Sequence, residues 1–481
     1  MYQKSRFAIY TGVFAALYSF CFYKNLTSIT FTLFVIATLV YEKFCAKQFG
    51  REWKKNTKFF EILVTIIGIS HPLTDKTFIH VFNFIFGFSI LIYIAISQFS
   101  NAEDWSFGVT FKNLFKSVFG AIGKIGAPFS DYSSYKTDKA MQAINEEEFK
   151  EKKKKAGIVA LTIFLTLPAL IIVTAILSSA DDVFKKLINT IFSDWSYKIP
   201  EYFVHTVKIC ILSFVVFLLA YGLFTYLLKD PFSKEIKAKQ PHDATAAITA
   251  GILFDIVYLA FSLIQVLYLF IGRFALPAGI NYANYARKGF FQVLFVCVLN
   301  LIMVLIGKSK FENNRLLKII LTIMCGCTYI MIASSAMRLL MYIRYYYFSF
   351  MRILAFWALS VVFLLLTGIL IHIWTDKIHL FRFSFKVILI AYTVLALSHT
   401  DYFVAELNMS KEITQSDFFV ADGYDDYDYI IEKTCLDAAP AVEKYNFSNK
   451  GKFYSHNNAD RKVTVRNFNL SKFIAKKLKA D

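Results

Sequence analysis

Long apolar runs recur along the first 400 or so residues of this 481-residue chain. A helix needs roughly 20 mostly apolar residues to cross about 30 Å of hydrocarbon, and inside lipid every backbone polar group needs a partner within the protein. The runs therefore predict an all-α polytopic transmembrane helical bundle of ten or eleven spans. We expect these spans at residues 7–22, 28–44, 58–72, 77–97, 156–179, 203–228, 246–272, 289–307, 316–336, 352–374 and 380–398.

The net charge of +18 would suggest nucleic acid as a partner if the chain were soluble. In a membrane protein, however, Lys and Arg concentrate in cytoplasmic loops. The basic residues are densest on the side where the N-terminus lies, around Lys47, Arg51 and Lys152 to Lys155. We therefore expect no nucleic-acid partner, a cytoplasmic N-terminus and a multi-pass protein of a bacterial inner membrane. The C-terminal tail would lie outside with eleven spans and inside with ten.

The runs divide the chain into four parts: a four-span region at 1–97, a cytoplasmic loop at 98–155, a membrane core at 156–399 and a small soluble tail at 400–481. Within the loop, apolar residues recur at helical spacing, namely Phe111, Leu114, Phe115, Val118, Phe119, Ile122 and Ile125. This pattern predicts an amphipathic helix, which either lies in the membrane interface or packs against the bundle. In the tail, we expect a short helix that ends at Pro440.

Four segments carry polar chemistry that a membrane helix does not need. The first is Asp181 at the end of a span, and the second runs from Gln265 to Tyr282, Tyr285 and Arg287. The third begins at Arg338 and Tyr342 and continues to Arg352, and the fourth is the tail stretch from Asp401 to Asn408, with Asp437 and Pro440 beyond it.

These segments make the chain similar to the bacterial membrane proteins grouped as domain of unknown function 4173, which are related to group 4153. The similarity is colinear from about residue 160 to 442, and it implies a membrane fold but no activity. One departure is that the family pattern reads Tyr-Gly-Leu-Thr where this chain has Tyr346-Tyr347-Phe348-Ser349. Loss of that glycine predicts a straighter helix here.

Arg338, Tyr342, Tyr345, Ser349 and Arg352 are three or four residues apart, so one helix would present them on one face. Two guanidinium groups on one stripe could bind an anionic headgroup or phosphate. The alternative is that the arginines reach the membrane boundary or pair with Asp181 or a carboxylate of the tail.

The other segments have similar alternatives. Tyr282, Tyr285 and Arg287 form either an interfacial aromatic belt or part of a ligand site, and Asp181 is expected to cap a helix. By the alternation of the spans, Asp181, Arg287 and Arg338 fall at one membrane face. Polar residues within the expected spans are Lys208, Asp255, Gln265 and Asn300. Asp255 could neutralise Lys208 or belong to an ion or proton path.

No catalytic, phosphate-binding or metal-binding motif is visible, and the seven cysteines form no ligand or dithiol pattern. We therefore expect no cofactor and favour a non-enzymatic protein of the lipid bilayer that binds or moves a small anionic or lipid-like ligand. A membrane enzyme acting on a lipid-linked or phosphate-bearing substrate is one alternative, and a sensor or scaffold is another. The sequence leaves the substrate and the oligomeric state open.

Overall fold

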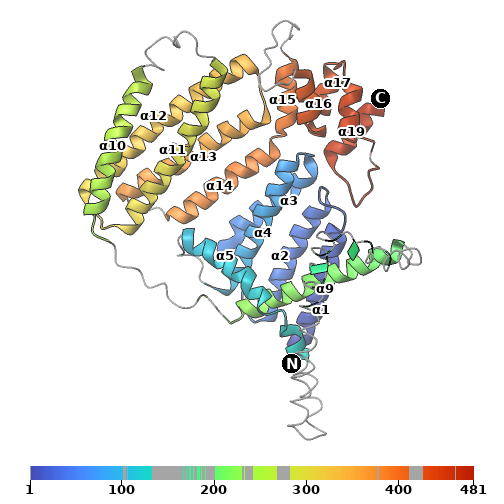
Figure 1. Cartoon of the computed structure of the whole chain (residues 1–481). Helices are drawn as coiled ribbons and strands as arrows, with labels where there is room; N and C mark the ends of the chain where they lie inside the picture. The colour runs from blue at the N-terminus through green and yellow to red at the C-terminus, as the bar shows by residue number, and fades with distance from the viewer. Residues whose placement is uncertain are drawn as a thin grey trace, which may run out of the picture.

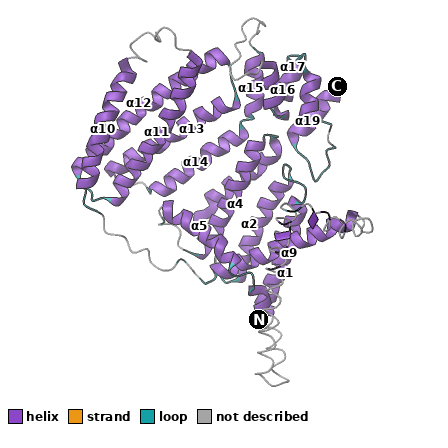
Figure 2. Cartoon of the chain, viewed as in Figure 1, coloured by secondary structure: helices purple, strands orange, loops and turns teal. Residues whose placement is uncertain are grey.

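The structure is a computed structural model. It describes residues 2–100, 105, 107–132, scattered positions between 166 and 190, 201–229, 232, 242–267, 282–375, 379–410, 426–460 and 462–480. Within these residues the regular secondary structure is helical and contains no strand (Figure 2). The predicted all-α class is therefore confirmed.

Most of the expected spans form helices. In the first part these are α1 (Tyr2–Phe22), α2 (Thr30–Gln48), α3 (Lys58–Ser70) and α4 (Thr77–Phe99). After α5 (Phe107–Ile122), the long helices are α9 (Glu201–Leu227), α10 (Thr245–Gln265), α11 (Tyr282–Lys310), α12 (Arg315–Tyr346), α13 (Phe350–Thr375) and α14 (Leu380–Leu397).

Six helices of the described residues are long and apolar enough to cross a membrane: α4, α9, α10, α11, α12 and α13. A seventh results if α14 and α15 (Thr400–Met409), which meet at a bend of 54°, form one broken span. The expected span at 58–72 is too short, because α3 has 13 residues. The one at 28–44 forms α2, which carries Glu42 and Lys43 within its apolar run. The one at 156–179 lies mostly outside the described residues.

Two groups of helices make up the membrane part (Figure 1). In the first, α1 packs against α2 and α9, while α3 packs against α4 and α14. Aromatic rings fill its core; for example, the ring centroids of Phe22 and Phe34 are 4.8 Å apart. In the second, α10, α11 and α13 pack around α12. α14 contacts both α13 and α3, and it thereby joins the two groups.

α11 and α12 form an antiparallel hairpin that turns at residues 311–314. The Asn314 side chain caps α12 by accepting a hydrogen bond of 2.8 Å from the backbone N–H of Leu316. Because the hairpin turns there, the first turns of α11 lie at the end where α12 finishes. α10 also finishes at this end, since Gln265 bonds to residues near the end of α12.

The last eighty or so residues form a small helical unit, which we call the terminal unit. It contains α15, α16 (Asp426–Lys433), α17 (Ala439–Lys444), α18 (Lys450–His456) and α19 (Leu470–Ala480) around a core of small and apolar side chains. Pro440 lies in the first turn of α17, so the expected helix ending there is wrong. A proline in the first turn costs no hydrogen bond, because the N–H groups there have no partner within the helix.

The terminal unit and the N-terminus lie at opposite ends of the helices (Figure 1). Arg466 donates to the carbonyls of Phe20 and Tyr23, which are at the C-terminal end of α1. An odd number of spans would likewise put the C-terminal tail and the N-terminus at opposite ends of the helices. The boundaries proposed at residues 97, 155 and 399 stay predictions.

Candidate functional site

Gln265 and Arg338, two of the predicted site residues, come together between α10 and α12. The Gln265 Oε1 accepts hydrogen bonds from Ser334 Oγ at 2.5 Å and from Arg338 Nη2 at 2.7 Å. All three residues are buried. A charge-assisted hydrogen bond is stronger than a neutral one, and hydrogen bonds between membrane helices contribute to their association. The pair therefore joins α10 to α12.

The predicted single stripe of arginines is wrong. α12 ends at Tyr346, and Tyr347 has a φ of 58°, so Arg352 belongs to the next helix, α13. The guanidinium of Arg352 lies 4.3 Å from the ring centroid of Tyr342, and its Nη1 donates to the Tyr347 carbonyl at 2.6 Å. Arg352 thus stabilises the break between α12 and α13.

The expectation of a straighter helix at Tyr347 is also wrong. The chain breaks there, at the position where the family pattern has glycine, and a positive φ explains why glycine suits it.

The remaining residues of the predicted outer-face site are described only in part. Tyr282, Tyr285 and Arg287 form the beginning of α11, at the end where Arg338 lies, but their side chains are outside the described residues. Asp181 is exposed, and its Oδ1 accepts the backbone N–H groups of Val183 at 2.7 Å and Phe184 at 3.2 Å. This geometry confirms the expected capping role. A ligand role for these four residues stays a prediction.

The predicted pair of Lys208 with Asp255 does not form. Lys208 is exposed on α9, which packs against α1 and α5, whereas α10 carries Asp255 toward α12. Both Asp255 carboxylate oxygens are buried without a hydrogen-bond partner among the described residues. Asn300, on α11, donates to Thr328 Oγ1 of α12 at 2.9 Å. Lys208 and Asp255 are therefore apart, because α9 and α10, although consecutive in sequence, belong to different groups of helices.

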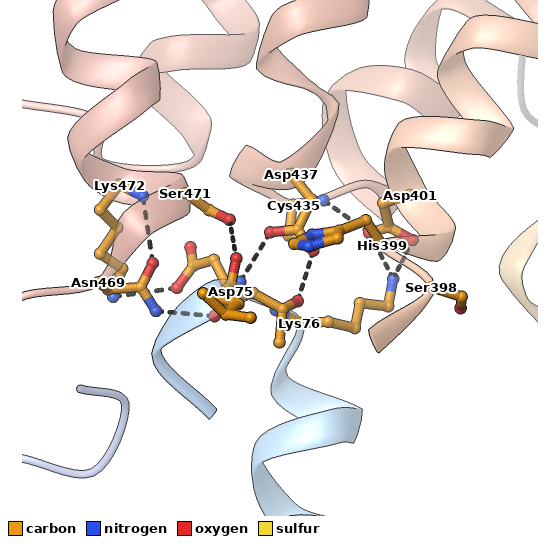
Figure 3. A network of polar contacts seen from close by, with 12 residues as sticks. Asp75, Lys76, Ser398, His399, Asp401, Cys435, Asp437, Asn469, Ser471 and Lys472 are labelled. Atoms are coloured by element: carbon orange, nitrogen blue, oxygen red, sulfur yellow. Dashed lines mark hydrogen bonds and ion pairs between the residues drawn. The ribbon is translucent and has the colours of Figure 1, made fainter. Parts of the chain in front are cut away.

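A network of charged and polar groups, which we call the polar joint, connects the terminal unit to the beginning of α4 (Figure 3). Lys76 Nζ donates to both carboxylate oxygens of Asp401, at 2.9 and 2.7 Å. Asp437 accepts hydrogen bonds from the Thr74 hydroxyl and, at 2.8 Å, from the Asp75 backbone N–H. The polar joint consists of Thr74, Asp75, Lys76, His399, Asp401 and Asp437.

The charged groups of the polar joint have partners: Lys76 is paired with Asp401, and Asp75 is paired with Lys472 of the terminal unit. Burial lowers the pKa of Lys76, but the Asp401 carboxylate outweighs burial and holds that pKa above its ordinary range. Burial raises the pKa of Asp437, but hydrogen bonds from His399, Ser471, Thr74 and the Asp75 backbone together hold it below its ordinary range. The contacts within the polar joint therefore favour the charged forms of Lys76 and Asp437.

The polar joint was not predicted from the sequence. Asp401 and Asp437 were singled out by the family resemblance, but Thr74, Asp75 and Lys76 look like an ordinary loop between two apolar runs. Their partners are more than 300 residues away along the chain. No local spacing could have indicated those contacts.

A hollow of about 520 Å³ lies at the opposite end of the first group, where α1 begins and α9 ends. We call it the interfacial hollow. It is lined by Phe7, Phe49, Gly123, Lys124, Gly126, Ala127, Ser130, Asp131, Tyr221, Thr225, Leu228 and Lys229. Its size is that of a small-molecule site.

The interfacial hollow combines apolar and basic groups. Phe7, Phe49 and Leu228 supply apolar surface, while Lys124 and Lys229 supply positive charge. Among the described residues, neither lysine side chain has a hydrogen-bond or ion-pair partner, whereas Asp131 accepts the Tyr221 hydroxyl at 2.7 Å. An apolar chain with an anionic head fits this combination.

α5 leads directly into the residues of the interfacial hollow, and it confirms the predicted amphipathic helix. It packs against α9 and α4, with Thr110, Ser117 and Ala121 buried. Its other face leaves large apolar side chains exposed, namely Phe111, Phe115, Val118, Phe119 and Ile122. Both predicted alternatives therefore have support, because one face packs on the bundle and the other is free to enter lipid.

No group of three or more His, Cys, Asp or Glu residues in the described part of the chain is arranged to hold a metal ion. The charged groups of the polar joint have partners within the protein, and Arg338 is hydrogen-bonded to Gln265. Unlike these two places, the interfacial hollow offers a ligand charged groups that have no partner among the described residues.

Comparison with known families identifies the class of this membrane protein. The family model described as "Domain of unknown function (DUF4153)" matches residues 62–445, which is most of the chain, and the chain belongs to that family. No curated protein and no solved structure matches it. The match covers the Gln265–Arg338 pair and all six residues of the polar joint, and it assigns no activity to them.

Proposed function

We propose that this multi-pass membrane protein binds an anionic, lipid-like ligand in the interfacial hollow and performs no chemistry on it. One observation carries the proposal. The interfacial hollow combines the ammonium groups of Lys124 and Lys229 with apolar side chains, and it lies beside the amphipathic helix α5. An ammonium group near a membrane surface attracts anionic headgroups, with a free energy of about 1 kcal/mol for each Lys.

The position of the hollow also supports this ligand. The exposed phenylalanines of α5 would lie at the boundary between headgroups and acyl chains. Lys124 follows α5 directly, and Lys229 follows α9, so both ammonium groups would lie at headgroup height. The ligand class is the one expected from the sequence, but the site is at the lysine-rich face instead of the face with Arg338.

We further infer that this lysine-rich face is cytoplasmic, that the N-terminus is on the same side, and that the membrane is the inner membrane of a bacterium. Basic loops at this end support that orientation. The colinear segments from about residue 160 to 442 support a relation to group 4173 as well.

To test the orientation, cysteine could be introduced at Lys112 and Ser455 and labelled with a membrane-impermeant maleimide. Only Ser455→Cys is expected to react from the outside, and reaction of Lys112→Cys alone would reverse the orientation.

The two alternatives have less support. An enzyme would need a base positioned beside the bound headgroup, and the carboxylate of the hollow, Asp131, already accepts the Tyr221 hydroxyl. A scaffold would need no ligand, and the free lysines of the hollow would then have no role.

The experiment is native mass spectrometry of the full chain titrated with phosphatidylglycerol or phosphatidylcholine. We expect preferential retention of phosphatidylglycerol, and we expect Lys124→Ala/Lys229→Ala to weaken that binding by roughly tenfold or more, from about 1 kcal/mol per lysine. The matched control is Lys112→Ala/Lys58→Ala, which removes two exposed lysines outside the hollow. Equal weakening in both double variants, or none in either, would overturn the proposal.

A further inference from the structure

α10 buries one narrow stripe of side chains and exposes most of the others. The buried residues, three to four positions apart, are Gly251, Asp255, Tyr258, Ser262 and Gln265. Gln265 has its partners on α12, as described above. Asp255 is only 5% exposed, yet neither of its carboxylate oxygens has a hydrogen-bond partner among the described residues.

Asp255 faces α12, and α11 approaches α10 at the neighbouring Tyr258. It is within electrostatic reach of Cys325 and Cys327 on α12, and Tyr258 on α10 is within reach of Cys297 on α11. All of these neighbours are uncharged residue types.

Asn300 follows Cys297 on α11, one helical turn away. Its amide nitrogen donates to Thr328 on α12, but its Oδ1 is buried without a donor among the described residues. The seam between α10, α11 and α12 therefore presents acceptor oxygens to which no described group donates.

No cation in the described chain neutralises Asp255. Arg338 bonds to Gln265, which is ten residues further along α10 and so about 15 Å away at the helical rise. Lys208 lies on a helix of the other group. An ionised carboxylate in an apolar interior costs several kcal/mol unless it is paired. Asp255 therefore requires a bound cation or a proton.

We propose that Asp255 is an intramembrane proton-binding site, whose carboxyl group is protonated when α10 is packed against α12. A proton suits the seam better than a metal ion does, because hard cations take about six oxygen ligands. The unpartnered oxygens of the described seam are those of the Asp255 carboxylate, Asn300 Oδ1 and Ser262 Oγ, which are fewer than six. The titratable groups that face the site are Tyr258, Cys297, Cys325 and Cys327.

The apolar surroundings of Asp255 also indicate how its proton would be released. An ionised Asp255 would be unfavourable against the apolar and thiol groups of α12. Loss of the proton would therefore favour movement of α10 away from α12, toward a place where water reaches the carboxylate. This site is independent of the interfacial hollow, because the two have no residue in common.

The test uses a hydrophobic carbodiimide on the full chain in detergent at neutral pH, followed by peptide mapping. A protonated carboxyl transfers its proton to a carbodiimide nitrogen while its oxygen adds to the central carbon, so ionised carboxylates react poorly. We expect an adduct on Asp255 that declines as the pH rises and is absent from Asp255→Asn. Asp243, which is exposed just before α10, is the control and should remain unlabelled at neutral pH.

Mapping the adduct in the unmodified chain keeps the test valid if Asp255→Asn fails to fold. A second measurement is infrared difference spectroscopy, in which a protonated carboxylic acid gives its own C=O stretching band. We expect that band in the native chain, with a shift on deuterium exchange and loss on alkalinisation. A folded chain with neither the adduct nor the band at neutral pH would overturn the proposal.

Discussion

The side chain of Lys76 is mostly buried, and its ammonium group forms an ion pair with Asp401, whose side chain is fully buried. Burial of two charges is costly, but removal of one partner leaves the other unpaired. The Lys76–Asp401 pair therefore stabilises the polar joint only when both residues are present.

We predict that Asp401→Ala destabilises the protein by about 3–5 kcal/mol, because Lys76 is then buried without its carboxylate. Thermal unfolding in detergent would measure the change. The matched control is Asp460→Ala, which removes an exposed carboxylate paired with Lys479 and should change stability by less than about 1 kcal/mol. Similar losses in the two variants would show that the pair contributes no more than a surface contact.

Tyr347 makes the second prediction at this scale. Its φ of 58° places a bulky residue in the left-handed region, which favours glycine. We predict that Tyr347→Gly is more stable than Tyr347→Ala by about 1 kcal/mol, because glycine relieves that strain. Comparing the two variants with each other removes the effect of losing the tyrosine ring. If the alanine variant is the more stable, the break between α12 and α13 is not strained at Tyr347.

At the scale of elements, the packing of α9 against the C-terminal end of α5 and the residues just after it shapes the interfacial hollow. A Cβ at Gly222 would lie 2.4 Å from the carbonyl oxygen of Ala121, so the two elements approach closely only because residue 222 has no side chain. We predict that Gly222→Ala destabilises the protein by about 1–3 kcal/mol and weakens ligand binding, because it forces the elements apart.

The control for Gly222→Ala is Gly108→Ala on α5, where an added Cβ meets nothing within 4 Å. Thermal unfolding and the lipid titration would be measured on both variants. An effect of Gly108→Ala equal to that of Gly222→Ala would mean that the close approach is unimportant.

The helices themselves were largely predictable from the sequence, whereas their partners were not. Hydropathy located α4 and α9 to α14, and helical spacing located α5. Contacts between elements depend on residues far apart in sequence, so the Lys76–Asp401 pair could not be derived from spacing. The predicted arginine stripe was wrong for a different reason. The prediction assumed one continuous helix over residues 338–352, but the helix breaks at Tyr347, which has a positive φ.

The interfacial hollow contains none of the site residues that were predicted from the sequence. Apolar phenylalanines and lysines around α5 predicted an amphipathic helix, but the ligand site was expected at the opposite face, near Arg338. Lys229 could not be connected to Lys124 from the sequence, because α9 returns to α5 only in the folded chain.

At the scale of the whole molecule, the terminal unit is attached to the membrane part by titratable groups, so its attachment should depend on pH. The pKa of Asp437 is held below its ordinary value of 3.8 in the folded protein. A depressed carboxylate pKa contributes stability at pH values above 3.8, and that contribution is lost as the pH falls through the folded value.

We therefore predict that the unfolding midpoint of the native chain falls on acidification below about pH 4, and that Asp437→Asn shows a smaller decrease over the same range. Unfolding midpoints measured between neutral and acidic pH would test this. An unchanged acid dependence in Asp437→Asn would assign the sensitivity to other carboxylates.

The central claim is that an anionic lipid-like ligand occupies the interfacial hollow, and photo-crosslinking tests it most directly. The full chain in lipid nanodiscs would be exposed to phosphatidylglycerol that carries a photoreactive group beside the head, and the linked peptides would be identified by mass spectrometry. We predict that crosslinks concentrate at residues 123–131 and 225–229 and that they are lost in Lys124→Ala/Lys229→Ala. Crosslinks spread over the exposed faces of α9 and α10, with none at the hollow, would contradict the claim.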